Sequence, residues 1–346
     1  MKTRITILLG IAISAVVMGL LLARLDIPRM QQAFATAEYV YVLPAAGLLA
    51  LGMFTRAIRW RALLMQRLAV VPSFSILSIS YLFNGALPLR LGEVVRIFLA
   101  SRPPARVPVV TTTSTIIVER LLDMLTVIGL LGGVIAVLDV PDSIASAGLM
   151  LGASAGGGLL VLIGLARWPG LAFGVLAWLE RRLPWLQRLA LKHVLARFLD
   201  GLAPLTSWRA ALQVMGWTAV SWVLSVVAGY VLMYAFFPRA SWVTTVLFIA
   251  LASLAVSVPY APGAVGPYEA GVVMALALTG FDQSQEAAVA FAIVLHGMTT
   301  GVFVVLGLWG LLQQGLGVRQ IVRGARDMHA NTTFDAGAPS GSARVE

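Results

Sequence analysis

The chain has 346 residues, of which 59% are hydrophobic and only 12% are charged. Soluble domains carry roughly one quarter charged residues, so this composition excludes an ordinary soluble protein and indicates that lipid covers most of the surface. The formal net charge is +10. The basic residues lie mainly between the apolar runs, where their preference for the cytoplasmic side explains them without a nucleic acid partner. Cysteine is absent, which excludes disulfides and thiol chemistry.

Long apolar runs predict an all-α polytopic membrane protein with about eight transmembrane helices, some of them re-entrant or broken. The runs are continuous, whereas the strands of a membrane β-barrel alternate apolar and polar residues. The runs are residues 5–23, 39–55, 68–89, 107–138, 143–166, 210–238, 240–268 and 287–318. We expect one transmembrane domain over residues 1–318 and a disordered cytoplasmic tail over residues 319–346.

Arginine-rich segments flank residues 68–89 on both sides. Because both flanks favour the cytoplasm, this run is expected to enter the membrane, break near Gly85 and Pro88, and return. Counting crossings then places both termini and the basic connection 167–209 in the cytoplasm, and requires the Pro/Gly-interrupted run 240–268 to be re-entrant as well. The basic connection has apolar and basic residues at helical spacing, which fits either an interfacial helix on anionic headgroups or a simple linker helix.

Glu119, Arg120 and Asp123 place charge inside the run 107–138. Each costs about 2.5–3.5 kcal/mol at the centre of a membrane helix, so the three must pair or face a wet cavity. On a helix Glu119 and Asp123 share a face, and Arg120 can pair with Asp123. One interpretation is an ion pair that locks two helices together. The other makes Glu119 and Asp123 proton carriers with His296 as a relay, although a hydrogen-bonded packing histidine is equally compatible.

Arg90, Glu93 and Arg96 recur at a spacing of three and therefore lie on one stripe. The two guanidiniums predict a clamp for a lipid phosphate, and the alternative is a set of anchors at the cytoplasmic surface. Asn84 and Pro88 favour the clamp, because a broken helix leaves backbone donors free for an anion.

Arginine and tryptophan also cluster at the end of the second apolar run. Arg56, Arg59, Trp60 and Arg61 have the composition of an interfacial belt. We therefore expect this cluster to lie at the membrane surface.

Pro262, Gly263 and Gly266 break the run 240–268, and Glu269 lies just beyond the break. Backbone left unpaired there must line a cavity or touch a ligand. The pattern echoes Pro88-x-x-x-Gly92-Glu93 in the first half. Paired Pro/Gly breaks in two halves of a membrane protein point to a transporter's central site.

Glu269 has no basic neighbour in its own segment. A buried carboxylate needs a partner, so we expect Arg90 or Arg120 to approach it. If the two breaks meet at one site, Asn84 and Arg90 should also lie close to Glu269 in the fold.

As a set, these motifs are similar to those of a known family. They are, in chain order, Arg59-Trp60, Asn84-x-x-x-Pro88-x-Arg90-x-Gly92-Glu93-x-x-Arg96, Glu119-Arg120-x-x-Asp123 and Pro262-Gly263-x-x-Gly266-x-x-Glu269. Their order and spacing resemble the flippase-like membrane domain of the lysylphosphatidylglycerol synthase family. His296 stands in a region where that family often carries an arginine.

The resemblance implies a multi-pass lipid translocase of the bacterial inner membrane, in which Arg90, Arg96 and Arg120 receive an anionic headgroup. The carboxylates of the motifs would accept protons or cationic groups. Its partners would be membrane lipids of phospholipid, polyprenyl-linked or hopanoid type. We expect a stand-alone member without the synthase domain, because the sequence ends soon after the last apolar run. Two alternatives stay open: an intramembrane transferase acting on lipid-linked substrates, and an accessory subunit of a lipid-modifying enzyme. The sequence suggests no metal site and no cofactor.

Overall fold

The structure is a computed structural model that describes residues 2–23, 25–86, 91–103, 106–138, 142–189, 191–257, 262–281, 284–317, 319–321 and 323–324. Within these ranges all regular structure is helical, as the apolar runs predicted. The α-helices are α1 (Lys2–Leu22), α2 (Ile27–Thr36), α3 (Val42–Leu63), α4 (Val70–Ala86), α5 (Leu91–Ser101), α6 (Val109–Ile135), α7 (Asp142–Arg167), α8 (Pro169–Arg182), α9 (Leu191–Leu202), α10 (Trp208–Met233), α11 (Trp242–Ser257), α12 (Pro267–Leu278) and α13 (Gln285–Gln314). The 3-10 helices are η1 (Tyr39–Tyr41), η3 (Pro184–Leu189), η4 (Ala203–Leu205) and η5 (Pro262–Ala264). The expected tail lies almost entirely outside the described residues.

Four of the described helical stretches are long and apolar enough to cross a membrane: Tyr39–Leu63, Gly148–Arg167, Trp208–Met233 and Gln285–Gln314. A fifth span results if α1 and α2, which meet at a bend of 89°, count as one. The 27 residues of α6 also suffice in length, but this helix carries the charged trio. α4, α11 and α12 are shorter. The polytopic all-α prediction is therefore confirmed.

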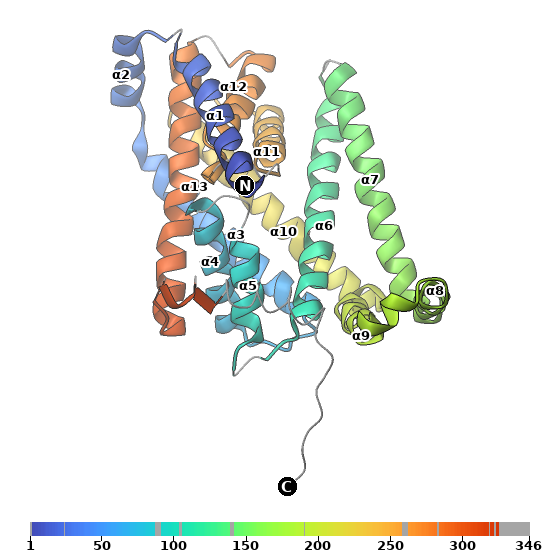
Figure 1. Ribbon diagram of the computed structural model, residues 1–346. Helices are drawn as coiled ribbons and strands as arrows, with labels where there is room; N and C mark the ends of the chain where they lie inside the picture. Colours follow the sequence, from blue (N-terminus) through green and yellow to red (C-terminus); the bar gives the residue numbers. More distant parts are fainter. Residues whose placement is uncertain are drawn as a thin grey trace.

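Helix ends gather at two opposite ends of the molecule (Figure 1). At the lower end in that view, Arg67 before α4, Arg102 after α5 and Gln314 at the end of α13 line one cavity. The backbone N–H of Glu38 donates to the carbonyl of Ala235, which joins the start of α3 to the end of α10. α6, α7, α10 and α13 connect the two ends.

Two helix pairs do not connect the ends but turn back in the middle. α4 rises from the lower end, and α5 returns to it alongside α4 (Figure 1). α11 descends from the upper end, and α12 returns to it. The return falls later in the chain than expected for the first pair: residues 70–86 form the single helix α4, and α5, which carries the buried Arg96, runs back beside it. Whether either pair is re-entrant in a membrane stays a prediction. α3, α6 and α13 each have one end at the lower end of the molecule, and α9 lies there as a whole (Figure 1).

The two hairpins meet where each one turns. η5, which joins α11 to α12, packs against α4, and the Cβ position of Gly263 lies 3.5 Å from the carbonyl oxygen of Gly85. Gly263 has φ +67° and Gly266 has φ +96°, conformations that glycine adopts at little cost. A Cβ atom on Gly266 would lie 2.7 Å from the carbonyl oxygen of Ser14, so α1 can cross this turn only over a glycine. The turn at η5 therefore packs against the end of α4 that precedes the first break. The closeness of Asn84 and Arg90 to Glu269 stays a prediction.

α8 and α9 lie at the lower end, where they run across the direction of α6 and α7 (Figure 1). Trp168, Trp178 and Trp185 are exposed on this part of the chain. Exposed tryptophans beside basic residues are typical of helices that lie in the membrane interface, which favours the interfacial interpretation of residues 167–209 over the linker interpretation.

A labelling experiment checks which end of the molecule faces the cytoplasm. In this cysteine-free chain, Ser207→Cys at the start of α10 and Ser340→Cys in the tail are expected to react with an impermeant thiol reagent only after the cells are permeabilised. Thr36→Cys at the end of α2 is expected to react in intact cells. Both Ser207 and Thr36 are exposed, so access to the side chain is not limiting. Labelling of Ser207→Cys in intact cells would overturn the assignment of the lower end to the cytoplasm.

Candidate functional site

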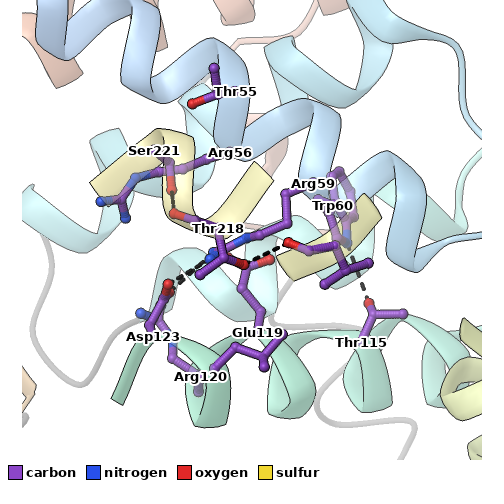
Figure 2. Close-up of polar contacts among 12 residues, drawn as sticks. Thr55, Arg56, Arg59, Trp60, Thr115, Glu119, Arg120, Asp123, Thr218 and Ser221 are labelled. Carbon is purple, nitrogen blue, oxygen red and sulfur yellow. Dashed lines mark hydrogen bonds and ion pairs between the residues drawn. The ribbon is translucent and has the colours of Figure 1, made fainter. Parts of the chain in front are cut away.

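A continuous set of ion pairs joins α3, α5 and α6 in the interior. Arg59 on α3 binds both carboxylate oxygens of Asp123 on α6, with 3.1 Å between Nη2 and Oδ2. Nη2 of Arg59 also lies 3.2 Å from Oε1 of Glu119. Arg96 on α5 binds Glu119 through two further hydrogen bonds of 3.2 and 2.8 Å. All four residues are buried, and Figure 2 shows Arg59 reaching toward both carboxylates. Each charge therefore has a partner that offsets its desolvation.

Arg59 and Trp60 do not form the interfacial belt that their composition suggested. Both are fully buried. The Trp60 indole donates to Oγ1 of Thr115 over 3.3 Å, and the Arg96 guanidinium lies 4.0 Å above the Trp60 ring. The belt prediction is wrong for these two residues, because the composition of a segment does not show which of its faces meets α6. Arg61, by contrast, bonds the carbonyl of Leu68 at the lower end of the molecule.

Arg120 pairs with Glu93 and not with Asp123. Its Nε donates to Oε1 of Glu93 over 2.9 Å, and its Nη2 contacts the same oxygen. Glu119 and Asp123 share the face of α6 that meets Arg59, whereas Arg120 points to a different face. The expected pair within α6 is therefore replaced by pairs between helices.

Glu269 is buried, and its partner is His296 of α13. The distance from Nδ1 of His296 to Oε1 of Glu269 is 2.6 Å, and the other carboxylate oxygen accepts the backbone N–H of Gly266 over 2.6 Å. Tyr268 stacks on the His296 ring with 4.3 Å between ring centroids. Arg120 is not the partner, as its bond to Glu93 shows, and Arg90 lies outside the described residues. A histidine thus fills the place that we assigned to an arginine.

Asn84 holds the turn of the first hairpin. Its Oδ1 accepts the backbone N–H of Gly92 over 2.9 Å. A Cβ atom on Gly92 would lie 2.0 Å from the carbonyl oxygen of Ser80, so α4 and α5 can approach this closely only through a glycine. Asn84 therefore positions α5 in this structure. Pro88 lies outside the described residues, as Arg90 does.

A cavity of about 330 Å³ lies where the hairpins and the spanning helices meet. Among the predicted site residues, Arg120 and Asp123 line the cavity. Glu269 does not line it, but the adjacent residue Tyr268 does. Glu93, Arg96 and Glu119 are not on its wall. Glu93 binds Arg120, which is on the wall, and Arg96 and Glu119 bind each other behind it. Apolar residues of several helices make up much of the remaining wall, including Leu49, Met53, Met124, Val127, Ile249, Leu254, Leu295 and Phe303.

Sequence reasoning missed several polar residues on the wall of the cavity. Arg56, Tyr81, Trp222 and Ser225 all line it. The Trp222 indole donates to Oδ1 of Asp123 over 3.1 Å and fixes this carboxylate from the side of α10. One signal was present in the sequence, because Arg56 is an ionisable residue within an apolar helix and such residues are usually functional. The hydroxyl and aromatic residues carried no comparable signal.

No group of three or more histidine or acidic residues in the described part of the chain is arranged to hold a metal ion. The polar side chains that line the cavity include guanidinium, carboxylate, hydroxyl and indole groups. Such groups bind anions and hydrogen-bond acceptors and exchange protons.

Comparison with known proteins relates this architecture to membrane lipid chemistry. Residues 7–307 match the family model described as the lysylphosphatidylglycerol synthase TM region. The chain is also similar to a glycosyltransferase, AglD, of Haloferax volcanii, with 24% identity over 342 residues. That alignment covers 89% of this chain but 54% of the relative, so the chain spans about half the length of the curated relative it matches. No solved structure matches the chain significantly.

Proposed function

We infer the function from the premise that this chain belongs to the lysylphosphatidylglycerol synthase TM-region family, and we propose that it moves a lipid with an anionic headgroup across the bacterial inner membrane. The observation that carries the proposal is the central cavity. It lies where two helix hairpins from opposite ends of the molecule meet, with arginine and aspartate on an otherwise largely apolar wall.

Broken helices that meet in the middle of a membrane protein are the usual setting of a transporter's substrate site. Here the hairpins α4–α5 and α11–α12 supply the breaks, and α4 packs against η5 between them. A substrate in this cavity would be reachable from either side by small movements of one hairpin against the other. This arrangement supports alternating access of the cavity to the two leaflets.

The wall of the cavity suits an amphiphile. Its apolar side chains would lie along acyl or prenyl chains, and the Arg120 guanidinium would face the headgroup. The Arg120 side chain is 34% exposed despite its bond to Glu93, whereas the Arg96 side chain is 2% exposed. We therefore assign direct headgroup contact to Arg120. Arg96 holds Glu119 and, through it, Arg59.

The buried pairs also bear on proton coupling. Two guanidiniums contact Glu119, and Arg59 with Trp222 holds Asp123. Opposite charges at these distances favour the ionised carboxylates and so favour the structural interpretation of the trio. Glu269 and His296 have one titratable partner each, which makes this pair the better candidate for a proton relay during transport.

Reconstitution tests translocation directly. Purified full-length protein in vesicles is expected to transfer fluorescently labelled phosphatidylglycerol between leaflets, measured by quenching of the outer leaflet. Asp123→Asn is expected to slow transfer at least tenfold, because the cavity becomes more positive and retains the headgroup instead of releasing it. Asp200→Asn is the matched control, since Asp200 is exposed on α9, and should transfer at the wild-type rate. Transfer no faster than in protein-free vesicles, for every lipid offered, would refute the proposal.

A transferase that acts on a lipid-linked substrate is the second candidate, and the printed name of the curated relative favours it. That name belongs to a protein of which this chain spans about half. A transferase needs a general base near its acceptor, and Glu269 with His296 is the available pair. The same vesicles, supplied with labelled polyprenyl-linked sugar, distinguish the two functions: a change in lipid mass indicates transfer of a group, and a change of leaflet at constant mass indicates translocation.

A further inference from the structure

Arg56 is the cationic residue of the cavity whose bonds go to neutral groups. Its Nη1 donates to the Tyr81 hydroxyl over 3.1 Å and its Nη2 to the Ser225 hydroxyl over 3.5 Å. The guanidinium lies 5.5 Å from the centre of the Trp222 ring. In the part of the chain that the structure describes, Arg56 has no carboxylate within ion-pair distance, unlike Arg59 and Arg120. Figure 2 marks no ion pair between its guanidinium and Asp123 or Glu119.

The charges around the cavity do not cancel. Four arginines are in or behind its wall, and three carboxylates face them across the ion pairs described above. The arginines are Arg56, Arg59, Arg96 and Arg120, and the carboxylates are Glu93, Glu119 and Asp123. One positive charge remains, and its geometry assigns it to Arg56. The wall taken alone gives the same excess, because its charged side chains among the described residues are Arg56, Arg120 and Asp123. Glu269 and His296 pair with each other and are not on this wall.

An unpaired cation within an apolar helix is expensive unless a ligand neutralises it. Guanidinium binds phosphate oxygens through paired hydrogen bonds. The hydroxyls of Tyr81 and Ser225, already beside Arg56, can donate to the same oxygens. The apolar remainder of the wall favours a phosphate that belongs to a lipid over a free ion.

The size of the excess charge restricts the ligand further. A phosphodiester carries one negative charge and would neutralise the cavity. A phosphate monoester carries about −1.5 to −2 at pH 7, and would leave a negative charge buried. A zwitterionic headgroup would bring an additional cation toward Arg56 and Arg120.

We propose that Arg56, with Tyr81 and Ser225, binds the phosphate of the headgroup that Arg120 also faces, and selects lipids whose headgroup is a singly charged phosphodiester. The assignment rests on the proposed translocation of a lipid through this cavity, and it names the class of substrate. Glycerophospholipids without a headgroup amine and polyprenyl phosphosugars both belong to this class. Diphosphate-linked lipids do not.

Binding of short-chain lipids to the purified full-length protein tests the site. Dihexanoyl phosphatidylglycerol is the phosphodiester probe, and its dissociation constant is compared with those of dihexanoyl phosphatidic acid, dihexanoyl phosphatidylcholine and inorganic phosphate. Arg56→Gln is expected to weaken phosphatidylglycerol binding at least tenfold, about the effect of losing a hydrogen-bonded charge. Arg56→Lys keeps the charge without the paired donors and should give an intermediate value. Arg29→Gln, at an exposed arginine of α2, is the matched control and should bind as the wild type does.

Thermal unfolding of each variant establishes that it is folded before binding is compared. Unchanged affinity in folded Arg56→Gln would overturn the site. Equal affinity for phosphatidic acid or phosphatidylcholine would overturn the charge selection, and equal affinity for inorganic phosphate would make the ligand a free anion instead of a lipid.

The leaflet-transfer assay separates this inference from the proposed function. Binding of phosphatidylglycerol that depends on Arg56, without transfer, would leave the site standing and refute translocation. If Arg56→Gln binds and transfers phosphatidylglycerol as the wild type does, translocation stands and the Arg56 site is refuted.

Discussion

Replacing Glu119 by Gln is expected to destabilise the protein by about 3–5 kcal/mol, the usual effect of leaving a buried charge without its partner. Glu119 is 1% exposed, and both Arg59 and Arg96 bind it. In the variant Arg59 keeps Asp123, but Arg96 loses its carboxylate entirely. The loss should appear as a lower midpoint of thermal unfolding in detergent, and the fraction of protein that inserts correctly should also fall.

A second substitution tests whether charge is the cause. In the double variant Arg96→Met with Glu119→Gln, the unpaired guanidinium is gone, so the protein should be more stable than Glu119→Gln alone. Glu180→Gln provides the comparison at a pair with an exposed partner, Lys192, where we expect a loss below about 1 kcal/mol. Destabilisations that simply add in the double variant would contradict the ion-pair account.

Replacing Gly92 by Ala is expected to separate α4 from α5 and to cost about 1–3 kcal/mol or more, as overpacking of a tight contact does. The new methyl group would lie 2.0 Å from a backbone oxygen of Ser80 and 2.6 Å from Oδ1 of Asn84. A backbone atom cannot rotate away, so α5 must move, and Glu93 and Arg96 move with it. Leaflet transfer should fall together with thermal stability.

Gly85→Ala is the matched control for this prediction. Gly85 lies in the same hairpin, and a Cβ atom there meets nothing within 4 Å. Alanine also favours a helix more than glycine does, so this variant should be as stable as the wild type or slightly more stable. Equal behaviour of Gly92→Ala and Gly85→Ala would show that the close approach of α4 and α5 does not hold the site together.

The sequence by itself determined the class of fold and indicated where the long apolar runs would be interrupted. Continuous apolar runs can satisfy their backbone in a membrane only as helices. Arginines on both flanks of residues 68–89 led us to expect a return within that run, but the run forms the single helix α4 and the chain returns along α5, which carries the buried Arg96. Pro262, Gly263 and Gly266 likewise marked the turn at η5. These features are local, because they depend on hydropathy, on flanking charge and on the backbone freedom of particular residues.

Only the tertiary structure decided which charges pair. Spacing along α6 allowed Arg120 to pair with Asp123, yet Arg120 binds Glu93, and Asp123 binds Arg59. Glu269 similarly takes His296 instead of an arginine. Several partners lay within reach of each charged residue, and the choice among them depends on which helix faces point at one another. That information is distributed over the packing of all the helices.

Arg56 shows the same limit most clearly. In the sequence it lies three residues before Arg59, in a segment with the composition of a membrane-surface belt. In the fold, one turn of α3 separates an arginine that two carboxylates contact from one whose hydrogen bonds, among the described residues, go to hydroxyl groups at the cavity. Residue types along a helix indicate that charges are buried. Whether a charge is neutralised depends on what the neighbouring helices place opposite it, and so the excess positive charge of the cavity became apparent only in three dimensions.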